Sequence, residues 1–79
     1  MNIDEITEFD EIAKFLRKRY PKRQNFEEKY LEIVNYFQER ASFYWPKTQF
    51  EGNPNEHSPV QTVKLAFEDT KEYLKEMLK

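Results

Sequence analysis

The fold is decided by residues 26–41, which read FEEKYLEIVNYFQERA. Apolar residues recur in this stretch every three or four positions, so they share one side of an α-helix. Asn25 stands three residues before Glu28, a spacing typical of a capping box at a helix start. The stretch therefore predicts an amphipathic helix near residues 26–41 with acids on its exposed side. Its apolar residues are Phe26, Tyr30, Ile33, Val34, Phe37 and Ala41.

Two further helices are predicted near residues 7–20 and 59–78. Pro21 ends the first, because a proline disfavours helical geometry in the residue before it. Ser58 and Pro59 begin the second, as a cap and a first helical residue. The fold class is therefore all-α, a small three- to four-helix bundle, and we expect no strand. The predicted core consists of Phe9, Leu16, Ile33, Val34, Phe37, Val63 and Phe67.

The segment 42–58 interrupts the helical pattern. It contains Pro46, Gly52 and Pro54, which favour turns, so we expect an irregular segment with at most a short helical turn near 42–45. Two interpretations of its aromatic residues stay open, core packing and an exposed partner site. Because two neighbouring residues cannot both point inward from one helical turn, at least one of Tyr44 and Trp45 should face out. The aromatic residues are Phe43, Tyr44, Trp45 and Phe50.

Composition limits the class of protein. A chain of 79 residues forms one domain, residues 1–79, and an aromatic content of 16% favours a folded one. The absence of cysteine excludes a disulfide framework and fits a reducing cytoplasm, where we place the protein. Gly52 is the only glycine, so no glycine-rich phosphate loop can form. No apolar run approaches the roughly 18 residues of a membrane span, and we expect no membrane contact.

Catalysis has no support in the sequence. His57 is the only histidine and lies in a turn-rich stretch, so we expect an exposed loop residue and no metal site. The carboxylates of residues 4–11 lie close together beside water, whereas general acid–base chemistry needs a carboxyl group in an apolar pocket. We therefore expect no enzyme, no cofactor and no metal.

A basic cluster follows the first predicted helix. Three interpretations of it stay open: charges that complement the helix dipole, contact with nucleic acid, and contact with an acidic protein partner. The net charge of −2 is unfavourable for a free-standing nucleic-acid binder, so nucleic acid is the less favoured partner. The cluster consists of Arg17, Lys18, Arg19, Lys22 and Arg23.

Three short motifs resemble a known family. They are residues 3–8 before the first helix, Tyr44-Trp45-Pro46, and Ser58-Pro59 followed by Val63-Lys64. In this order the chain resembles the immunity proteins of nuclease colicins and S-type pyocins, small four-helix proteins that bind and inhibit a toxic nuclease domain. The family's His-Pro-x-Gly-x-Asp turn is missing, and residues 39–42 stand in its place.

The resemblance implies how the chain would bind. Tyr44 and Trp45 would be the shared anchor, and the exposed acids Glu28, Glu32 and Glu39 would set partner choice. We therefore expect a small protein-binding module, an inhibitor or immunity protein that neutralises a nuclease or another toxin by direct binding. The alternative is a nucleic-acid-associated accessory protein that uses residues 17–23.

Overall fold

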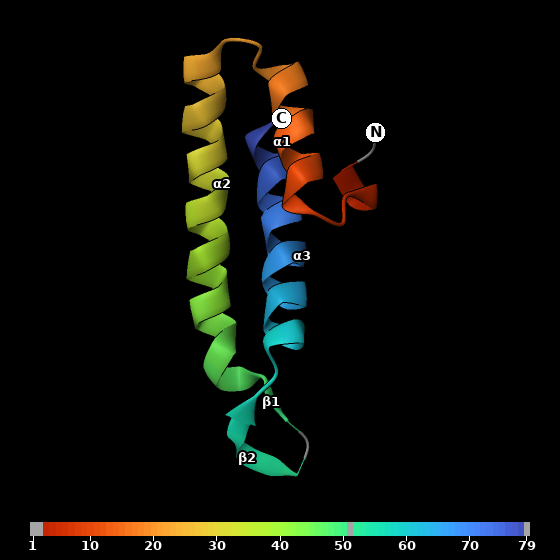
Figure 1. Cartoon of the computed structure of the whole chain (residues 1–79), viewed down its shortest axis with the longest axis vertical. Helices are drawn as coiled ribbons and strands as arrows, with labels where there is room; N and C mark the ends of the chain where they lie inside the picture. Colours follow the sequence, from red (N-terminus) through yellow and green to blue (C-terminus); the bar gives the residue numbers. More distant parts are fainter. Residues whose placement is uncertain (1–2, 51, 79) are drawn as a thin grey trace.

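The computed structural model describes residues 3–50 and 52–78, and this part of the chain is mostly helical (Figure 1). The all-α fold class is therefore confirmed in this coarse sense. Within the described residues, the helices and strands follow in the order η1 (Ile3–Glu5), α1 (Phe9–Arg19), α2 (Arg23–Tyr44), η2 (Trp45–Lys47), β1 (Gln49–Phe50), β2 (Asn53–His57) and α3 (Pro59–Met77), where η marks a 3-10 helix.

Helix α2 is longer than the sequence predicts at both ends. It runs from Arg23 to Tyr44 without an internal glycine or proline, and it ends only where Pro46 cannot continue it. Residues 45–47 then tighten into the 3-10 turn η2. The short helical turn that the sequence allowed near residues 42–45 is the last turn of α2, residues 42–44, so the irregular part of the segment begins later than residue 42.

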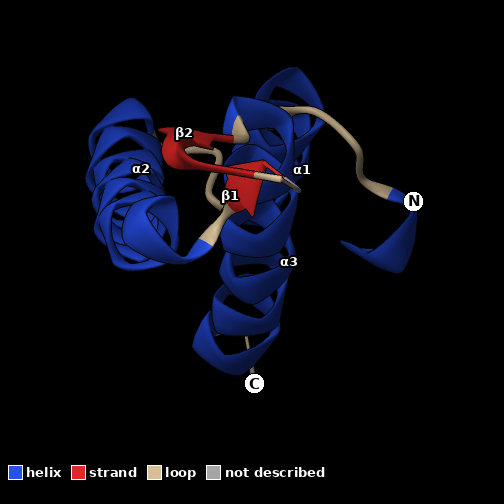
Figure 2. Cartoon of the chain, turned by 90° about the horizontal axis from the view of Figure 1, so that it is seen from below, coloured by secondary structure: helices blue, strands red, loops and turns tan. Residues whose placement is uncertain are grey.

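A two-stranded antiparallel hairpin joins α2 to α3, so the expectation of no strand is also wrong. Gln49 pairs with His57 and Phe50 with Asn53. Gly52 lies in the connecting turn with a φ of +81°, a conformation that glycine adopts without steric cost. The hydroxyl groups of Thr48 and Thr62 meet in a buried hydrogen bond that fixes the base of the hairpin to α3. Viewed along the long axis, the hairpin lies across the ends of α2 and α3 (Figure 2).

The core lies where all three α-helices meet. Leu16, Ile33 and Phe67 are buried there, as predicted, whereas Phe9, Val34 and Phe37 are half-buried. The prediction for Val63 is wrong, because its side chain is 50% exposed. The buried apolar residues are Ile6, Ile12, Leu16, Ile33, Ala66, Phe67 and Leu74.

The position of α1 along α3 explains why Val63 is exposed. The Phe9 ring, at the first residue of α1, meets Phe37 edge-on at 4.8 Å and Phe67 at 5.5 Å between ring centroids. Helix α1 lies beside the part of α3 that is distant from the hairpin (Figure 1), so the hairpin-proximal parts of α2 and α3 have no third helix over them. Val60 consequently remains 78% exposed at the start of α3. The result is an elongated molecule, with a radius of gyration of 14.3 Å against about 12 Å for a compact domain of this length.

The segment before α1 is attached to the far end of α3. Lys75 forms an ion pair with the Asp4 carboxylate, and the Lys71 ammonium donates a hydrogen bond of 3.4 Å to the Asp4 carbonyl. Between these contacts and α1, Ile6 is fully buried. The attachment closes this end of the core.

Candidate protein-binding surface

The aromatic residues at the end of α2 differ in their exposure to solvent. Phe43 and Trp45 are exposed to 46% and 45%, whereas Tyr44 between them is half-buried. The side chain of Phe50 lies outside the part of the molecule that the structure describes. Of the two anchor residues proposed from the sequence, Trp45 therefore faces out and Tyr44 faces the neighbouring helix.

Tyr44 takes part in a polar contact between α2 and α3. Its hydroxyl donates a hydrogen bond of 2.8 Å to Oδ2 of Asp69, and Nε of Arg40 donates one of 2.8 Å to the same oxygen. The Arg40 guanidinium also lies 3.4 Å from the Tyr44 hydroxyl. These hydrogen bonds, first to Tyr44 and then to Asp69, raise the pKa of Arg40 further above its ordinary value. Tyr44 thus acts as an interhelical link and positions its neighbours.

Phe43 is the aromatic residue that sequence reasoning did not select as a site residue. Two cations lie against its ring, the Arg40 guanidinium at 4.4 Å and the Lys47 ammonium at 4.2 Å from the centroid. Such contacts restrain an exposed ring by about 0.5–1 kcal/mol each. Phe43 therefore combines a large exposed area with a restrained position, which suits a binding anchor.

Trp45 rests on the hairpin. Its ring lies 4.8 Å from that of His57, centroid to centroid, at an interplanar angle of 35°. His57 is half-buried at the end of β2 rather than exposed in a loop, so that expectation is wrong. Its Nδ1 atom is buried and has no hydrogen-bond partner among the described residues.

The three acids proposed from the sequence all lie exposed on α2. Glu28, Glu32 and Glu39, here called the acidic stripe, share one side of the helix because their spacings of four and seven residues match one and two turns. Phe43 continues the same spacing four residues after Glu39. Tyr44 is rotated by about 100° away from Phe43. The structure therefore aligns the acidic stripe with Phe43 and not with Tyr44.

The acidic stripe is largely free of internal ion pairs. Glu32 has the Lys29 ammonium 3.6 Å away, at the surface. Within the described residues, Glu28 and Glu39 have no cation within ion-pair distance. The stripe with Phe43 extends over about 22 Å of α2. Its carboxylates are available to a cationic partner.

The basic cluster lies at the other end of the molecule, where α1 ends and α2 begins (Figure 1). All five of its side chains are exposed, and the structure does not bring them near Trp45. A separate apolar groove of about 520 Å³ opens beside the start of α1. Residues that line it include Ile6, Phe9, Phe37, Val60, Val63 and Phe67.

The described residues offer no metal-binding group. In residues 3–50 and 52–78, no three histidine, aspartate or glutamate side chains lie close enough together to hold a metal ion. None of the helices in that part of the chain combines the length and the apolar composition that crossing a membrane requires.

Comparison of the chain with protein families, characterised proteins and solved structures gives no match. Two of the short motifs named in the sequence analysis lie at helix ends. Tyr44 ends α2, Trp45 and Pro46 lie in η2, and the Ser58 hydroxyl oxygen caps α3 by accepting a hydrogen bond of 3.2 Å from the Gln61 amide.

Proposed function

We propose that this chain is a small protein-binding module whose acidic stripe, with Phe43 and Trp45 at one end, docks on a basic surface of a partner protein. The observation that carries the proposal is the 46% exposure of Phe43 in line with the carboxylates of the acidic stripe. Trp45, 45% exposed, lies at the same end of α2. Small proteins commonly bind partners through a few aromatic anchors surrounded by charged residues.

The two kinds of residue contribute differently to such an interface. Burial of an aromatic anchor supplies most of the binding free energy, and its truncation typically costs at least about 2 kcal/mol. Carboxylates at the rim contribute less to affinity but accelerate association with a cationic partner and select against wrong ones. In this proposal Phe43 and Trp45 are the anchors, and Glu28, Glu32 and Glu39 set partner choice.

A nuclease or another toxin is the partner class that we propose. Proteins that act on nucleic acids carry positive surfaces for phosphate contact, and the acidic stripe has the complementary sign. The resemblance to nuclease immunity proteins points to the same class. In the proposal, η2 takes the place of that family's short third helix, and binding of the toxin inhibits it.

Affinity capture from the native host tests the proposal. The bait is the full chain, and the matched variants are Phe43→Ala with Trp45→Ala, and Lys22→Glu with Arg23→Glu as a distant exposed pair. We expect a basic protein that is retained by the wild type and the distant variant but lost with the aromatic variant. If the captured protein is a nuclease, stoichiometric addition of the chain should abolish its cleavage of DNA or RNA. Capture that is indifferent to the aromatic variant would exclude this surface.

A further inference from the structure

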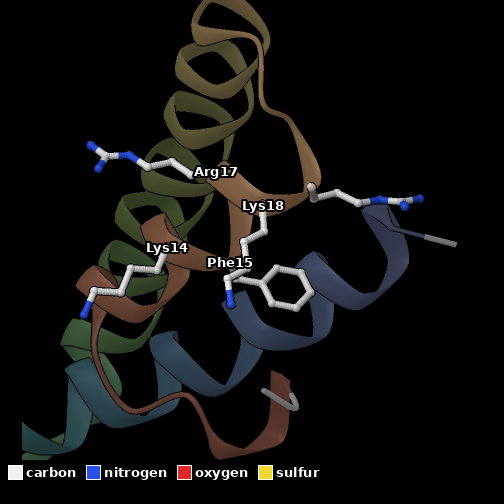
Figure 3. Close-up of a pocket in the computed structure, with 5 residues that line it drawn as sticks. Lys14, Phe15, Arg17 and Lys18 are labelled. Atoms are coloured by element: carbon white, nitrogen blue, oxygen red, sulfur yellow. The ribbon is translucent and has the colours of Figure 1, made fainter.

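A second surface of opposite charge lies on α1, towards the end of the molecule opposite the hairpin (Figure 1). It is a shallow groove of about 580 Å³, here called the basic groove, beside the last turns of α1 (Figure 3). Phe15 provides the apolar part of its lining, and the other described lining residues are all cations. These residues are Lys14, Phe15, Arg17, Lys18 and Arg19.

The side chain of Phe15 forms the apolar base of the basic groove. The ring is half-buried and packs against the core, and Figure 3 shows it turned towards the ribbon of α3. Lys18 and Arg19 follow Phe15 by three and four residues, so they lie one turn further along the same side of α1. An apolar contact and two positive charges are therefore within reach of one bound segment.

Three of the four cations that line this groove have no carboxylate partner among the described residues. In the part of the chain that the structure describes, Lys14, Lys18 and Arg19 are exposed and have no carboxylate within ion-pair distance. The fourth lining cation, Arg17, and Arg23 outside the groove do have partners. Arg17 lies over the Phe26 ring at 5.1 Å, and Arg23 pairs with Glu27 at 2.9 Å.

We infer that the basic groove binds an acidic amphipathic helix of a partner protein, with an apolar side chain against Phe15 and carboxylates at Lys18 and Arg19. The groove has the charge that complements such a helix, and residues three and four apart on the helix can present both kinds of side chain together. This site is distant from Phe43 and independent of the proposed function. A chain that uses both surfaces would bridge a basic partner and an acidic one.

The extent of the positive surface favours an acidic helix over nucleic acid. Lys14 and Arg19 are only about 8 Å apart along the helix axis. Glu11 lies one turn before Lys14, and on the other side Lys22 and Arg23 are followed by Glu27 and Glu28 in the first turns of α2. A nucleic-acid strand longer than this short interval would bring its phosphates against those carboxylates, and its affinity rests on the number of phosphates neutralised. Two carboxylates of a helix fit within the interval.

Fluorescence anisotropy with the full chain tests the inference. The probe is a fluorescein-labelled amphipathic peptide with leucine at every third and fourth position, glutamate beside the leucines and alanine or glutamine elsewhere, which favours a helix, and a second probe replaces each leucine by serine. The test variant is Lys18→Glu with Arg19→Glu. The matched control is Lys22→Glu with Arg23→Glu, which makes the same change in charge outside the groove. Circular dichroism confirms that both variants are folded.

We expect the test variant to weaken binding of the leucine peptide by about tenfold or more, and the control variant by less than about threefold. The serine peptide should bind more weakly than the leucine peptide. Equal losses in the two variants, or no binding at about 1 mM peptide, would overturn the inference. So would tighter binding of a single-stranded oligonucleotide or of anionic vesicles, or self-association in sedimentation that Lys18→Glu with Arg19→Glu abolishes, because each identifies a different occupant.

Discussion

The hydroxyl of Tyr44, in the last turn of α2, donates a hydrogen bond of 2.8 Å to the carboxylate of Asp69 in α3. The two residues are 25 positions apart, and their contact fixes the end of α2 against its neighbour. Because Tyr44 points towards α3, the adjacent Phe43 and Trp45 are directed away from it. The contact therefore orients the two exposed aromatic residues of the proposed binding surface.

The first prediction concerns this hydrogen bond. Tyr44→Phe removes the hydroxyl but keeps the ring, and we expect the free energy of unfolding to fall by about 1 kcal/mol, the usual contribution of one hydrogen bond. Urea denaturation followed by circular dichroism measures it. Tyr36→Phe is the matched control, because the Tyr36 ring stacks on Tyr73 at 4.3 Å but its hydroxyl has no hydrogen bond within the described residues. Equal losses in the two variants would show that the Asp69 contact contributes nothing.

The second prediction separates binding from folding at neighbouring positions. Phe43→Ala should lower the free energy of unfolding by about 1–2 kcal/mol, since the exposed ring loses two cation contacts and an edge contact with Tyr44. It should nevertheless cost about 2 kcal/mol or more of binding to the captured partner. Tyr44→Ala should show the opposite pattern, with a loss of about 2–3 kcal/mol in stability. Calorimetric titration and thermal unfolding of the same samples provide both values. If Phe43→Ala leaves affinity unchanged, Phe43 is not an anchor.

The third prediction uses the unequal burial of two residues that the sequence placed together in the core. Phe37 contacts Phe9 edge-on and is half-buried, so Phe37→Ala should lower the free energy of unfolding by about 3 kcal/mol. Val63 is half-exposed at the apolar groove, and Val63→Ala should cost less than about 1 kcal/mol. Chemical denaturation of both variants tests the difference. A similar cost for both would mean that a third element covers Val63 in solution.

The fourth prediction concerns pH. The hydrogen bond from Lys75 holds the pKa of Asp4 below its ordinary value of 3.8. A carboxylate with a depressed pKa in the folded state stabilises that state at higher pH, and this contribution is lost as the pH falls through the folded-state pKa. The attachment of η1 should therefore persist above pH 3.8 and weaken below it.

Two measurements test the attachment of η1. A carbon-detected NMR titration should place the midpoint of the Asp4 carboxyl group below 3.8. Hydrogen exchange at the Ile6 amide, which donates to the Ile3 carbonyl at 3.1 Å, should be faster in Asp4→Asn than in the wild type at neutral pH. A midpoint at or above 3.8, or unchanged exchange in the variant, would contradict the proposed attachment.

The sequence predicted the parts of the fold that follow from local periodicity. Three helices near the observed positions follow from apolar spacing and from Pro21, Ser58 and Pro59. The helical turn near residues 42–45 was anticipated, but its continuity with α2 was not, because its stabilising partner, Asp69, lies far away in the sequence. The hairpin was missed because residues 53–57 are polar and lack the alternation of a half-buried strand, so its formation depends on Gly52 and on contacts of Thr48.

The candidate surface was predicted in part. The acids of α2 were expected to be exposed and are so, because their spacing places them opposite the apolar side. Phe43 was named among the aromatic residues of segment 42–58, but its alignment with these acids was not predicted. The helical spacing of Glu28, Glu32 and Glu39 continues to Phe43, and this could have indicated that Phe43 lies on the same side. The spacing is informative only if the helix is known to reach residue 44. The position of α1 against α3, which exposes Val63, depends on tertiary packing that no local pattern encodes.

The place where α1 begins also has a consequence for local unfolding. The first half of α2 shares its core with two other helices, whereas the part beyond Phe37 packs mainly on α3 and the hairpin. Segments with fewer apolar neighbours open at a lower free energy than the rest of a domain. Phe43 and Trp45 both lie on this less protected part. A partner that binds there must suppress those opening motions. The free energy needed to order the end of α2 therefore reduces the observed binding free energy.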